Sequence, residues 1–342
     1  MNYKIEKKEN NLIEKETFKN LISINITNEN YMHYEEDNSF IIFQSIDDIL
    51  TLIYSNKKMS IISFNLIDSK KIIEIKKAHK LNISNFRHYL DEKNKRDLII
   101  SISGGDNNIK LWDINKVLCL FNFANINQNG RLYSACFLND DNHNYIVTSN
   151  SHLFGTELIK VFDFNGNKIK EINDSNINVF TIDTFYDKKL STNFILASNI
   201  GYIYTFDYNK NKYYNKFCDD YLNIFIFYII FIDNDEKIKL ISSTVYGNVK
   251  IWDFHSGQLL KKIKVIKGCL RGICLWNNDY LYVGCQDTTI KLINLNNGKI
   301  IQNLEGHFKE VSSIKKIFHP KLGECLISQG IGGDYLKLWY AK

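Results

Sequence analysis

Proline and glycine are both scarce in this sequence. Its 342 residues include a single proline, Pro320, and 17 glycines. A composition this poor in both residues excludes collagen, proline-rich spacers and glycine/serine tethers. Turns must instead rely on Asn and Asp, which tolerate left-handed backbone and hydrogen-bond to their own main chain. Hydrophobic residues make up 44% of the chain, which is enough for a large buried core.

Long hydrophobic runs are missing as well. The first ten residues, MNYKIEKKEN, lack the apolar core of a signal peptide. The longest apolar run covers residues 222–232 and is about half of the ~20 residues that a membrane-spanning helix needs. We predict that this run is a buried inner strand, with an exposed apolar patch as the alternative. We expect an intracellular protein without membrane insertion, cytoplasmic in the first place and with the nucleus left open.

The motifs that hold metals, phosphates or nucleophiles are also absent. The chain has seven cysteines but no CxxC pair, and it contains no HExxH, EF-hand, GxxxxGK[ST] or GxGxxG motif. We expect the cysteines to be small buried hydrophobes in a reducing compartment. The alternative is a thiolate cluster formed by Cys269, Cys274 and Cys285. We therefore predict no metal site, no cofactor and no catalytic residue.

What the chain does contain is a repeat with a period of about 46 residues. Each copy is a short run of β-branched and aromatic residues that ends in an aromatic side chain, usually followed by Asp, as in IKLWD and VKIWD. A fixed period of this length indicates a repeat architecture. The aromatic or equivalent positions are Phe64, Trp112, Phe162, Phe206, Trp252, Ile293 and Trp339.

Within each period the pattern is that of strands. Runs of four to eight residues rich in Ile, Val, Phe and Tyr alternate with Asn, Asp, Ser and Gly, which predicts four antiparallel strands per repeat. The second repeat divides into strands over 83–90, 98–103, 109–114 and 117–123. After the third strand come Asn165-Gly166, Ser256-Gly257 and Asn297-Gly298, which predict tight hairpin turns with positive φ at both central residues.

These features resemble the WD40-repeat family of β-propellers over residues 21–340. The second repeat carries the family signature as Ala78-His79, Asp106 and Trp112-Asp113, and the seventh carries Gly306-His307, Asp334 and Trp339. The resemblance implies an all-β fold with seven blades. We expect a single propeller over 21–342 behind a polar extension over 1–20. The seventh repeat lacks a fourth strand of its own, so we predict that LISINIT, residues 21–27, supplies it and closes the ring.

The resemblance also implies a buried polar network inside a blade. A histidine before the first strand, a serine on the second, an aspartate in the next turn and a tryptophan on the third would bond to one another. The same side chains could be misread as a nucleophilic triad, which needs an accessible serine and an oxyanion site. We predict the structural role for His79, Ser101, Ser103, Asp106, Trp112, His307, Asp334 and Trp339.

We predict a non-enzymatic protein-interaction scaffold that presents one face of the propeller and its channel mouth to partner proteins or peptides in a multi-subunit complex. Rigid blades hold short connections in place, so a few anchoring side chains supply the affinity. The enlarged turn over 151–157 carries an apolar tip that either folds back or contacts a partner. The candidate partner-binding residues are Asn82, Arg131, Phe154, Tyr246, Arg271, Lys309 and Glu310.

The alternative function is that of an RNA- or ribosome-associated propeller. The net charge of +5 does not by itself indicate nucleic acid. Lysines nevertheless gather on or near the predicted outer strands, where they would either form a solvated rim that discourages edge pairing or bind phosphate. These lysines are Lys76, Lys77, Lys80, Lys261, Lys262, Lys264 and Lys267.

Overall fold

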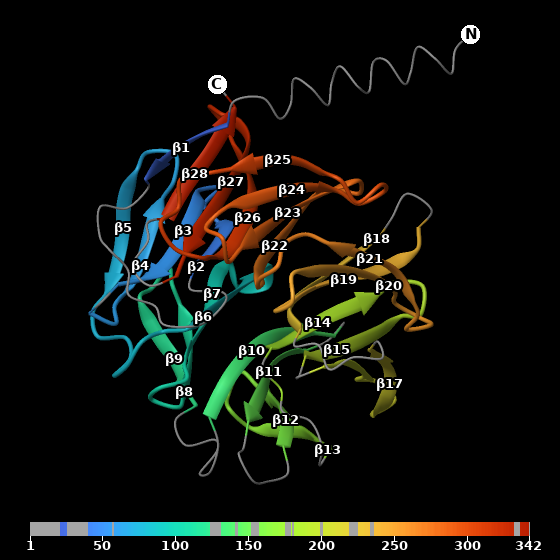
Figure 1. Ribbon diagram of the computed structural model, residues 1–342. Coiled ribbons are helices and arrows are strands. Elements are labelled where there is room, and N and C mark those ends of the chain that lie inside the picture. Colours follow the sequence, from blue (N-terminus) through green and yellow to red (C-terminus); the bar gives the residue numbers. More distant parts are fainter. Residues whose placement is uncertain are drawn as a thin grey trace.

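The computed structural model shows seven four-stranded antiparallel sheets arranged as the blades of a β-propeller (Figure 1). The seven-bladed fold predicted from the repeat is therefore confirmed. The structure describes residues 21–25, 40–56, 58–123, 131–140, 143–151, 157–174, 179, 181–198, 201–218, 225–232, 236–331 and 336–341. None of the helices in this part of the chain is both long and apolar enough to cross a bilayer.

The first four blades each use four consecutive strands. Blade 1 contains β2 (Phe40–Gln44), β3 (Leu50–Ser55), β4 (Ile61–Asn65) and β5 (Lys70–Ile75). Blade 2 contains β6 (Asn85–Asp91), β7 (Arg96–Ser103), β8 (Asn108–Asp113) and β9 (Leu118–Asn122), with the 3₁₀ turn η1 (Glu92–Asn94) between its first two strands. Blade 3 contains β10 (Arg131–Asn139), β11 (Asn144–Ser151), β12 (Glu157–Asp163) and β13 (Lys168–Asp174). Blade 4 contains β14 (Thr181–Asp187), β15 (Thr192–Ser198), β16 (Ile203–Asp207) and β17 (Lys212–Phe217).

The remaining blades follow the same order until the last. Blade 5 contains β18 (Phe225–Ile232), β19 (Ile238–Thr244), β20 (Asn248–Asp253) and β21 (Leu259–Lys264). Blade 6 contains β22 (Leu270–Asn277), β23 (Tyr280–Cys285), β24 (Ile290–Asn294) and β25 (Ile300–Leu304). Blade 7 contains β26 (Val311–His319), β27 (Gly323–Gly330), β28 (Leu336–Ala341) and, as its fourth strand, β1 (Leu21–Asn25).

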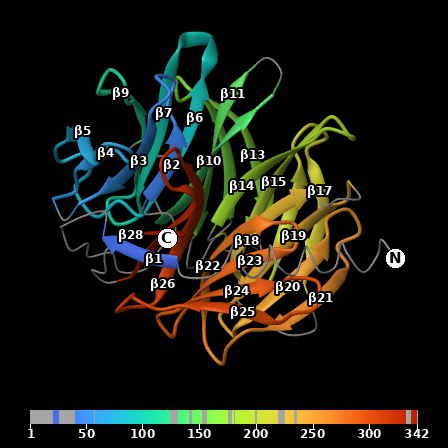
Figure 2. The same ribbon diagram turned by 90° about the horizontal axis from the view of Figure 1, so that it is seen from above.

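The ring is closed by this N-terminal strand, as predicted. β1 pairs antiparallel with β28, and Ser23 lies opposite Trp339 in the register. Figure 2 shows blue β1 beside the red strands of blade 7. Strands from opposite ends of the described sequence thus complete one sheet, and blade 7 has no free edge at β28.

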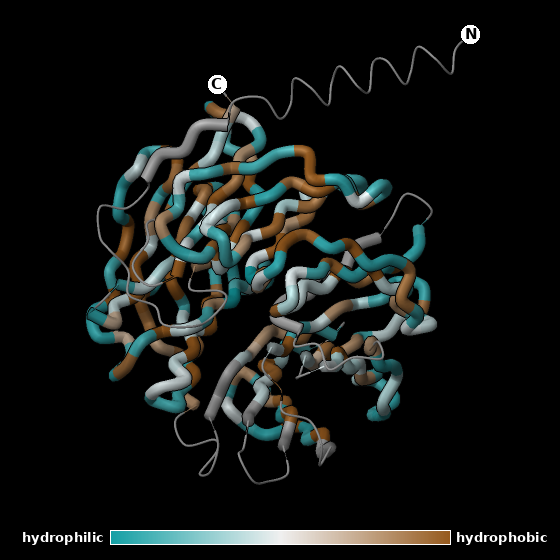
Figure 3. The backbone as a smooth tube through the Cα atoms, in the orientation of Figure 1, coloured by the Kyte–Doolittle hydropathy of each residue, from teal (hydrophilic) through white to brown (hydrophobic). Residues whose placement is uncertain are grey.

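The core consists of seven hydrophobic clusters, and each lies between two neighbouring blades. Between blades 4 and 5, for example, Phe194 and Phe217 pack with Trp252 and Phe254, all four fully buried. Apolar segments accordingly follow the strands, while hydrophilic ones gather in the connections (Figure 3). The first strands of adjacent blades also touch, as β22 does with β26 and β10 with β14.

The aromatic position of the repeat always faces the preceding blade. Trp112 belongs to the cluster between blades 1 and 2, and Trp339 to the cluster between blades 6 and 7. In blades 1 to 6 a β-bulge between the third and fourth strands falls directly before this position, as between Leu111 and Trp112. The bulge increases the local twist of the hairpin. In blade 7, where no turn joins β28 to β1, the register is continuous.

The Asp or Asn after the aromatic position builds the next turn. Asp113 Oδ1 accepts the amide of Lys116 at 3.1 Å, and Asp207 Oδ1 accepts that of Lys210 at 2.8 Å. Asn65 does the same for Ile67 at 2.9 Å. These side-chain hydrogen bonds stabilise the turns that proline would otherwise favour. They explain how the chain forms its turns with a single proline.

The predicted two-residue hairpins are wrong in detail. The glycines do have positive φ, at +83° for Gly166, +71° for Gly257 and +75° for Gly298, but the residue before each does not. In blade 5 the Asp253 amide donates to the Gln258 carbonyl at 2.9 Å, so the connection is longer than two residues. Glycine is therefore needed only at the final left-handed position of a longer loop, a common hairpin geometry.

Two further predictions concern segments that are only partly described. The apolar run at 222–232 contributes β18, the first strand of its blade, which agrees with the predicted strand; residues 222–224 lie outside the described residues. The enlarged turn of blade 3 includes residues 152–156, which also lie outside them, and Phe154 is among these.

Removal of β1 is expected to open the ring. Deletion of residues 1–30 exposes the hydrogen-bonding edge of β28, and we expect the melting temperature to fall by roughly 5 °C or more, since about 1 kcal/mol corresponds to a shift of about 2–4 °C in large domains. Thermal unfolding followed by circular dichroism measures this. The matched control deletes residues 1–20 and keeps β1, so its melting temperature should not change. Equal melting temperatures for all three proteins would contradict closure by β1.

Candidate functional site

Four side chains of blade 2 form a continuous buried network. Ser101 Oγ, on β7, lies 2.8 Å from His79 Nε2 and accepts a hydrogen bond of 2.8 Å from the Trp112 indole N–H. His79 Nδ1 lies 3.2 Å from Asp106 Oδ2, and Asp106 also accepts the Lys80 amide at 2.8 Å. If the proton of His79 is on Nδ1, this nitrogen donates to Asp106 and Nε2 accepts a hydrogen bond from the Ser101 hydroxyl. Every side chain of the network then has a hydrogen-bond partner. The network ties the start of the blade to its second and third strands.

The Asp106 carboxylate is stabilised in its ionised form. Burial raises the pKa of Asp106, but the hydrogen bonds from His79 and from the Lys80 amide outweigh this and leave the pKa below its usual value. The carboxylate therefore carries its charge at neutral pH and holds the His79 ring in place.

Ser103 joins the network only through Asp106, because its side chain also forms a hydrogen bond that helps to lower the pKa of the Asp106 carboxyl. It is buried at the end of β7, and its hydroxyl lies 3.5 Å from the Asp106 amide that it accepts. It thus links the end of β7 to the turn between β7 and β8. Of the two serines named from the sequence, the structure brings only Ser101 into contact with His79 and Trp112.

Blade 7 repeats the central part of the arrangement. Ser328 Oγ lies 2.6 Å from His307 Nε2 and accepts the Trp339 indole N–H at 2.7 Å. Asp334 lies outside the described residues. In blade 5 the indole of Trp252 donates to Ser242 Oγ at 2.9 Å.

Ser328 and Ser242 were not identified from the sequence. The spacing could have revealed them: Ser101 precedes Trp112 by 11 residues, Ser328 precedes Trp339 by 11, and Ser242 precedes Trp252 by 10. A serine near that distance before each tryptophan of the repeat is a usable signal for the hydroxyl that accepts the indole N–H.

The cysteine positions do not form a metal centre in the described part of the chain. Cys269, Cys274 and Cys285 are buried and free, and burial raises the pKa of the Cys285 thiol to about 12. No group of three or more His, Cys, Asp and Glu side chains suited to a metal occurs among the described residues.

The candidate partner-binding residues that the structure describes lie at one end of the blades. In an antiparallel meander, the connection between the second and third strands and the connection to the next blade meet at the same end. We call this end the top face and the opposite one the bottom face. Asn82 follows β5, Tyr246 lies between β19 and β20, and Lys309 precedes β26. Arg131, whose side chain lies outside the description, begins β10 at this end.

Arg271 and Glu310 contact each other across the top face. Arg271 Nε, in blade 6, donates to Glu310 Oε2 at 2.8 Å, just before blade 7 begins. Both side chains are about one quarter exposed. The pair links two neighbouring blades while it remains open to solvent on one side.

Exposed apolar side chains on the top face were largely missed in the sequence. Tyr246, which was named, is 57% exposed; Phe308 is 76% exposed and Leu81 50%. The Lys337 ammonium lies 5.8 Å from the centre of the Phe308 ring. Phe308 and Leu81 each follow the histidine of a blade network within two residues. An apolar residue at that place, flanked by charged or polar neighbours, is the signal that could have found them.

The described part of the top face carries more basic than acidic residues. Tyr246 is fixed there by Lys264, whose ammonium donates to the Tyr246 carbonyl at 2.5 Å. Acidic residues of the same connections are fewer: Asp106, Asp287, Glu305 and Glu310. The described basic residues at this end are Lys58, Lys76, Lys77, Lys80, Lys264, Lys267, Arg271, Lys309 and Lys337.

Comparison with known proteins gives one informative similarity. No protein-family model matches the chain. A curated protein of the fission yeast Schizosaccharomyces pombe, the "U3 small nucleolar RNA-associated protein 21 homolog", is 29% identical over 110 residues, which is 32% of this chain. The similarity covers 12% of that protein, so the matched segment is about an eighth of the relative's length.

Substitution Ser101→Ala should lower the free energy of unfolding by about 1–3 kcal/mol, because the buried indole N–H and imidazole lose their shared partner. Urea denaturation measures the loss. Ser103→Ala is the matched control and should cost less, because the hydrogen bonds of Ser103 are with Asp106 at the end of the network and not with His79 or Trp112. Equal losses for the two variants would contradict the role assigned to Ser101.

Asp106 should make stability depend on pH in the acid range. Its folded-state pKa lies below the unfolded value of about 3.9, so its contribution is present above that pH and is lost as the pH falls through the folded value. We expect the stability difference between the wild type and Asp106→Asn to be largest above about pH 4 and to shrink below it. Urea midpoints over a pH series measure this. A difference that stays the same at the lowest pH would contradict it.

Proposed function

We propose that this chain, a WD40-repeat β-propeller, is a non-enzymatic scaffold that holds partner proteins of a multi-subunit complex at its top face. The observation that carries the proposal is the exposure of Phe308 and Tyr246 on short connections of a rigid framework. Large aromatic side chains presented this way are the usual anchors of protein interfaces.

The buried network supports a role without catalysis. Ser101 is 0% exposed, and its hydroxyl is occupied by His79 and Trp112. A nucleophile needs access to its substrate and an oxyanion site beside it. The Ser–His–Asp constellation therefore serves the stiffness of the blade, and the side chains left for function are those of the connections.

The surroundings of the two aromatics suit a specific interface. The Arg271–Glu310 pair and Lys309 supply charges beside Phe308, and partly exposed charges of this kind select partners and orient them. The Tyr246 carbonyl accepts the Lys264 ammonium, and the Gly247 amide closes the turn onto the Thr244 carbonyl at 3.1 Å. The connection that carries Tyr246 is thus held in place before a partner arrives, which reduces the entropic cost of binding.

The printed name of the yeast relative refers to a small nucleolar RNA. It supports a place for this chain in an RNA-associated complex, and with it a nuclear rather than a cytoplasmic location. The expectation of a cytoplasmic protein gains no support from the comparison.

Direct binding of RNA is the second candidate function. Exposed aromatic rings among basic side chains can stack bases while the lysines neutralise phosphates. Phe308 with Lys309, and Tyr246 with Lys264 and Lys267, have this composition. We favour the scaffold over direct RNA binding, because these positions are spread over separate blades and do not form one continuous groove in the described residues.

Affinity purification from the native cell tests the proposal with three proteins: the wild type, a Phe308→Ala/Tyr246→Ala variant and a matched Phe318→Ala/Leu190→Ala variant on the bottom face. We expect the top-face variant to lose the principal co-purifying proteins at least ~10-fold, as loss of anchor side chains predicts. The bottom-face variant should retain them.

Nuclease treatment separates the two candidate functions in the same experiment. Partners that persist after nuclease and depend on Phe308 and Tyr246 indicate protein contacts. Partners lost on nuclease treatment, with RNA retention that falls steeply with salt, indicate the RNA-binding alternative. Retention of every partner by the top-face variant would contradict both.

A further inference from the structure

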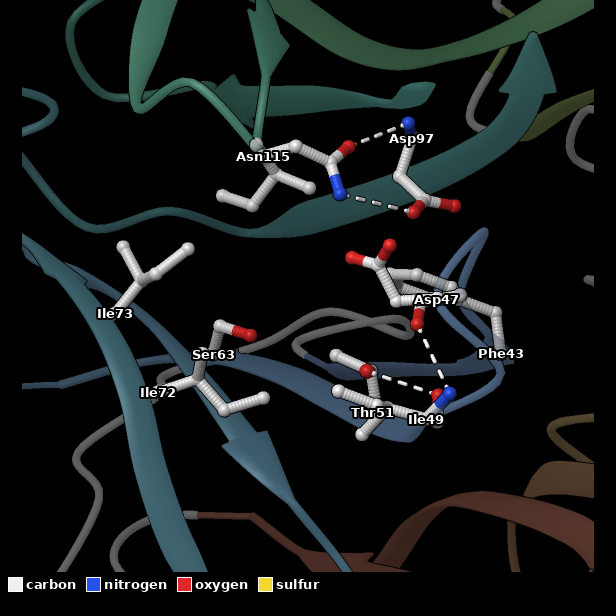
Figure 4. Close-up of a pocket in the computed structure, with 11 residues that line it drawn as sticks. Phe43, Asp47, Ile49, Thr51, Ser63, Ile72, Ile73, Asp97 and Asn115 are labelled. Atoms are coloured by element: carbon white, nitrogen blue, oxygen red, sulfur yellow. Dashed lines mark hydrogen bonds between the residues drawn. The ribbon is translucent and has the colours of Figure 1, made fainter. Parts of the chain in front are cut away.

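A pocket of about 160 Å³ lies between blades 1 and 2 on the bottom face, away from the proposed partner surface (Figure 4). We call it the blade 1–2 pocket. Its walls come from the β2–β3 connection and β5 of blade 1, and from the start of β7 and the β8–β9 connection of blade 2. Small-molecule sites usually exceed about 300 Å³, whereas a cavity of about 150 Å³ holds one benzene-sized group. The blade 1–2 pocket therefore has the size of a single side chain.

One wall of the pocket is held in place by Asp97. This carboxylate is fully buried; it lies 2.8 Å from His88 Nε2 and accepts the Ile46 amide at 2.9 Å. The Asn115 side chain accepts the Asp97 amide at 2.7 Å. Burial raises the pKa of Asp97, but the bonds from His88 and the Ile46 amide outweigh this and lower the pKa below its usual value. The wall is thus rigid and its carboxylate is ionised at neutral pH.

Asp47 adds a second carboxylate at the mouth. Figure 4 shows its carboxylate directed toward the side of the pocket formed by Asp97 and Asn115. The turn that carries Asp47 is fixed by the Asp48 amide, which donates to the Ser45 carbonyl at 2.9 Å, and by the bond from Ile46 to Asp97. Among the described residues, no side chain forms an ion pair with the Asp47 carboxylate, and no residue that lines the pocket is basic.

The opposite wall is apolar. Ile72 and Ile73 of β5 face the pocket, and Ile49 and Ile114 complete it. Ile72 is 46% exposed, so part of this apolar surface meets solvent when nothing covers it. A side chain that enters the pocket would meet apolar carbons along its length and negative charge near the two carboxylates.

We propose that the blade 1–2 pocket binds a basic side chain, lysine or arginine, from a partner peptide. The long aliphatic stem packs against Ile72 and Ile73, and the cationic end lies beside Asp47. Lysine and arginine combine these two properties, because their stems bury apolar surface while their heads remain charged. An anion is repelled by both carboxylates, and a purely apolar side chain gains nothing from the exposed carboxylate of Asp47.

Methyl NMR of isoleucine-labelled protein tests the proposal, because four isoleucines line the pocket. The probes are N-acetyl-arginine methylamide, the corresponding lysine derivative and the citrulline derivative, which has nearly the shape of arginine without its charge. We expect arginine or lysine to shift the methyl signals of Ile49, Ile72, Ile73 and Ile114. Signals of Ile300 and Ile301, exposed on distant β25, should not move.

Two variants separate the charge from the shape of the pocket. Asp47→Asn should weaken binding of the cationic probes by up to about 5-fold, the usual scale for an exposed charge pair. Asp68→Asn, which removes an exposed carboxylate from the β4–β5 connection of the same blade, should leave binding unchanged. Equal affinity for the arginine and citrulline derivatives, or no shift of the four pocket isoleucines at the solubility limit of the probes, would overturn the proposal. These readouts do not involve the top face, so they are independent of the proposed scaffold function.

Discussion

The packing of one side chain per repeat against the preceding blade is the contact on which this propeller depends. The molecule has no single central core, because its apolar surface is divided among seven junctions. At each junction from blade 2 onward, the aromatic position of the third strand supplies a large buried group, and Trp252 and Trp339 are among the largest. A blade removed from its neighbours would expose both faces of its sheet. Stability is therefore shared, as expected of repeat architectures whose units cannot bury their apolar faces alone.

The need to stabilise each blade also determines which residues remain available for function. Ser101 and His79 are used inside a blade, where an unpaired hydroxyl or imidazole would be costly. The repeat thus uses its most reactive residue types to stabilise the sheet. Some residues of the connections, such as Phe254, are buried in the junctions, but the exposed Phe308 and Tyr246 lie outside the seven hydrophobic clusters and are free to vary. Rigid blades and variable connections together suit a molecule that presents surfaces.

The fold could be predicted from the sequence because its period and its Trp-Asp signature are local features. Closure by β1 also followed, since the seventh repeat needs a fourth strand. The predicted hairpin geometry was wrong, because an Asn-Gly pair alone does not determine the length of a loop. The length is determined by the Asp at the end of the third strand, which accepts hydrogen bonds from amides of the turn. The Arg271–Glu310 pair and the blade 1–2 pocket could not be predicted, since each depends on how two separate blades approach. The exposure of Phe308 was missed although its place directly after the network histidine of its repeat, which Leu81 nearly shares, offered a signal.

The pairing of β1 with β28 has a consequence for how the protein is made. A nascent chain emerges from the ribosome N-terminus first, so β1 is available long before its partner. Blades 1 to 6 can form in order from local hairpins, but blade 7 needs the two most distant strands of the described sequence. Contacts of such high sequence separation form slowly and leave strand edges open in the meantime. Pairing of β28 with β1, rather than formation of any single blade, is then the step that closes the ring.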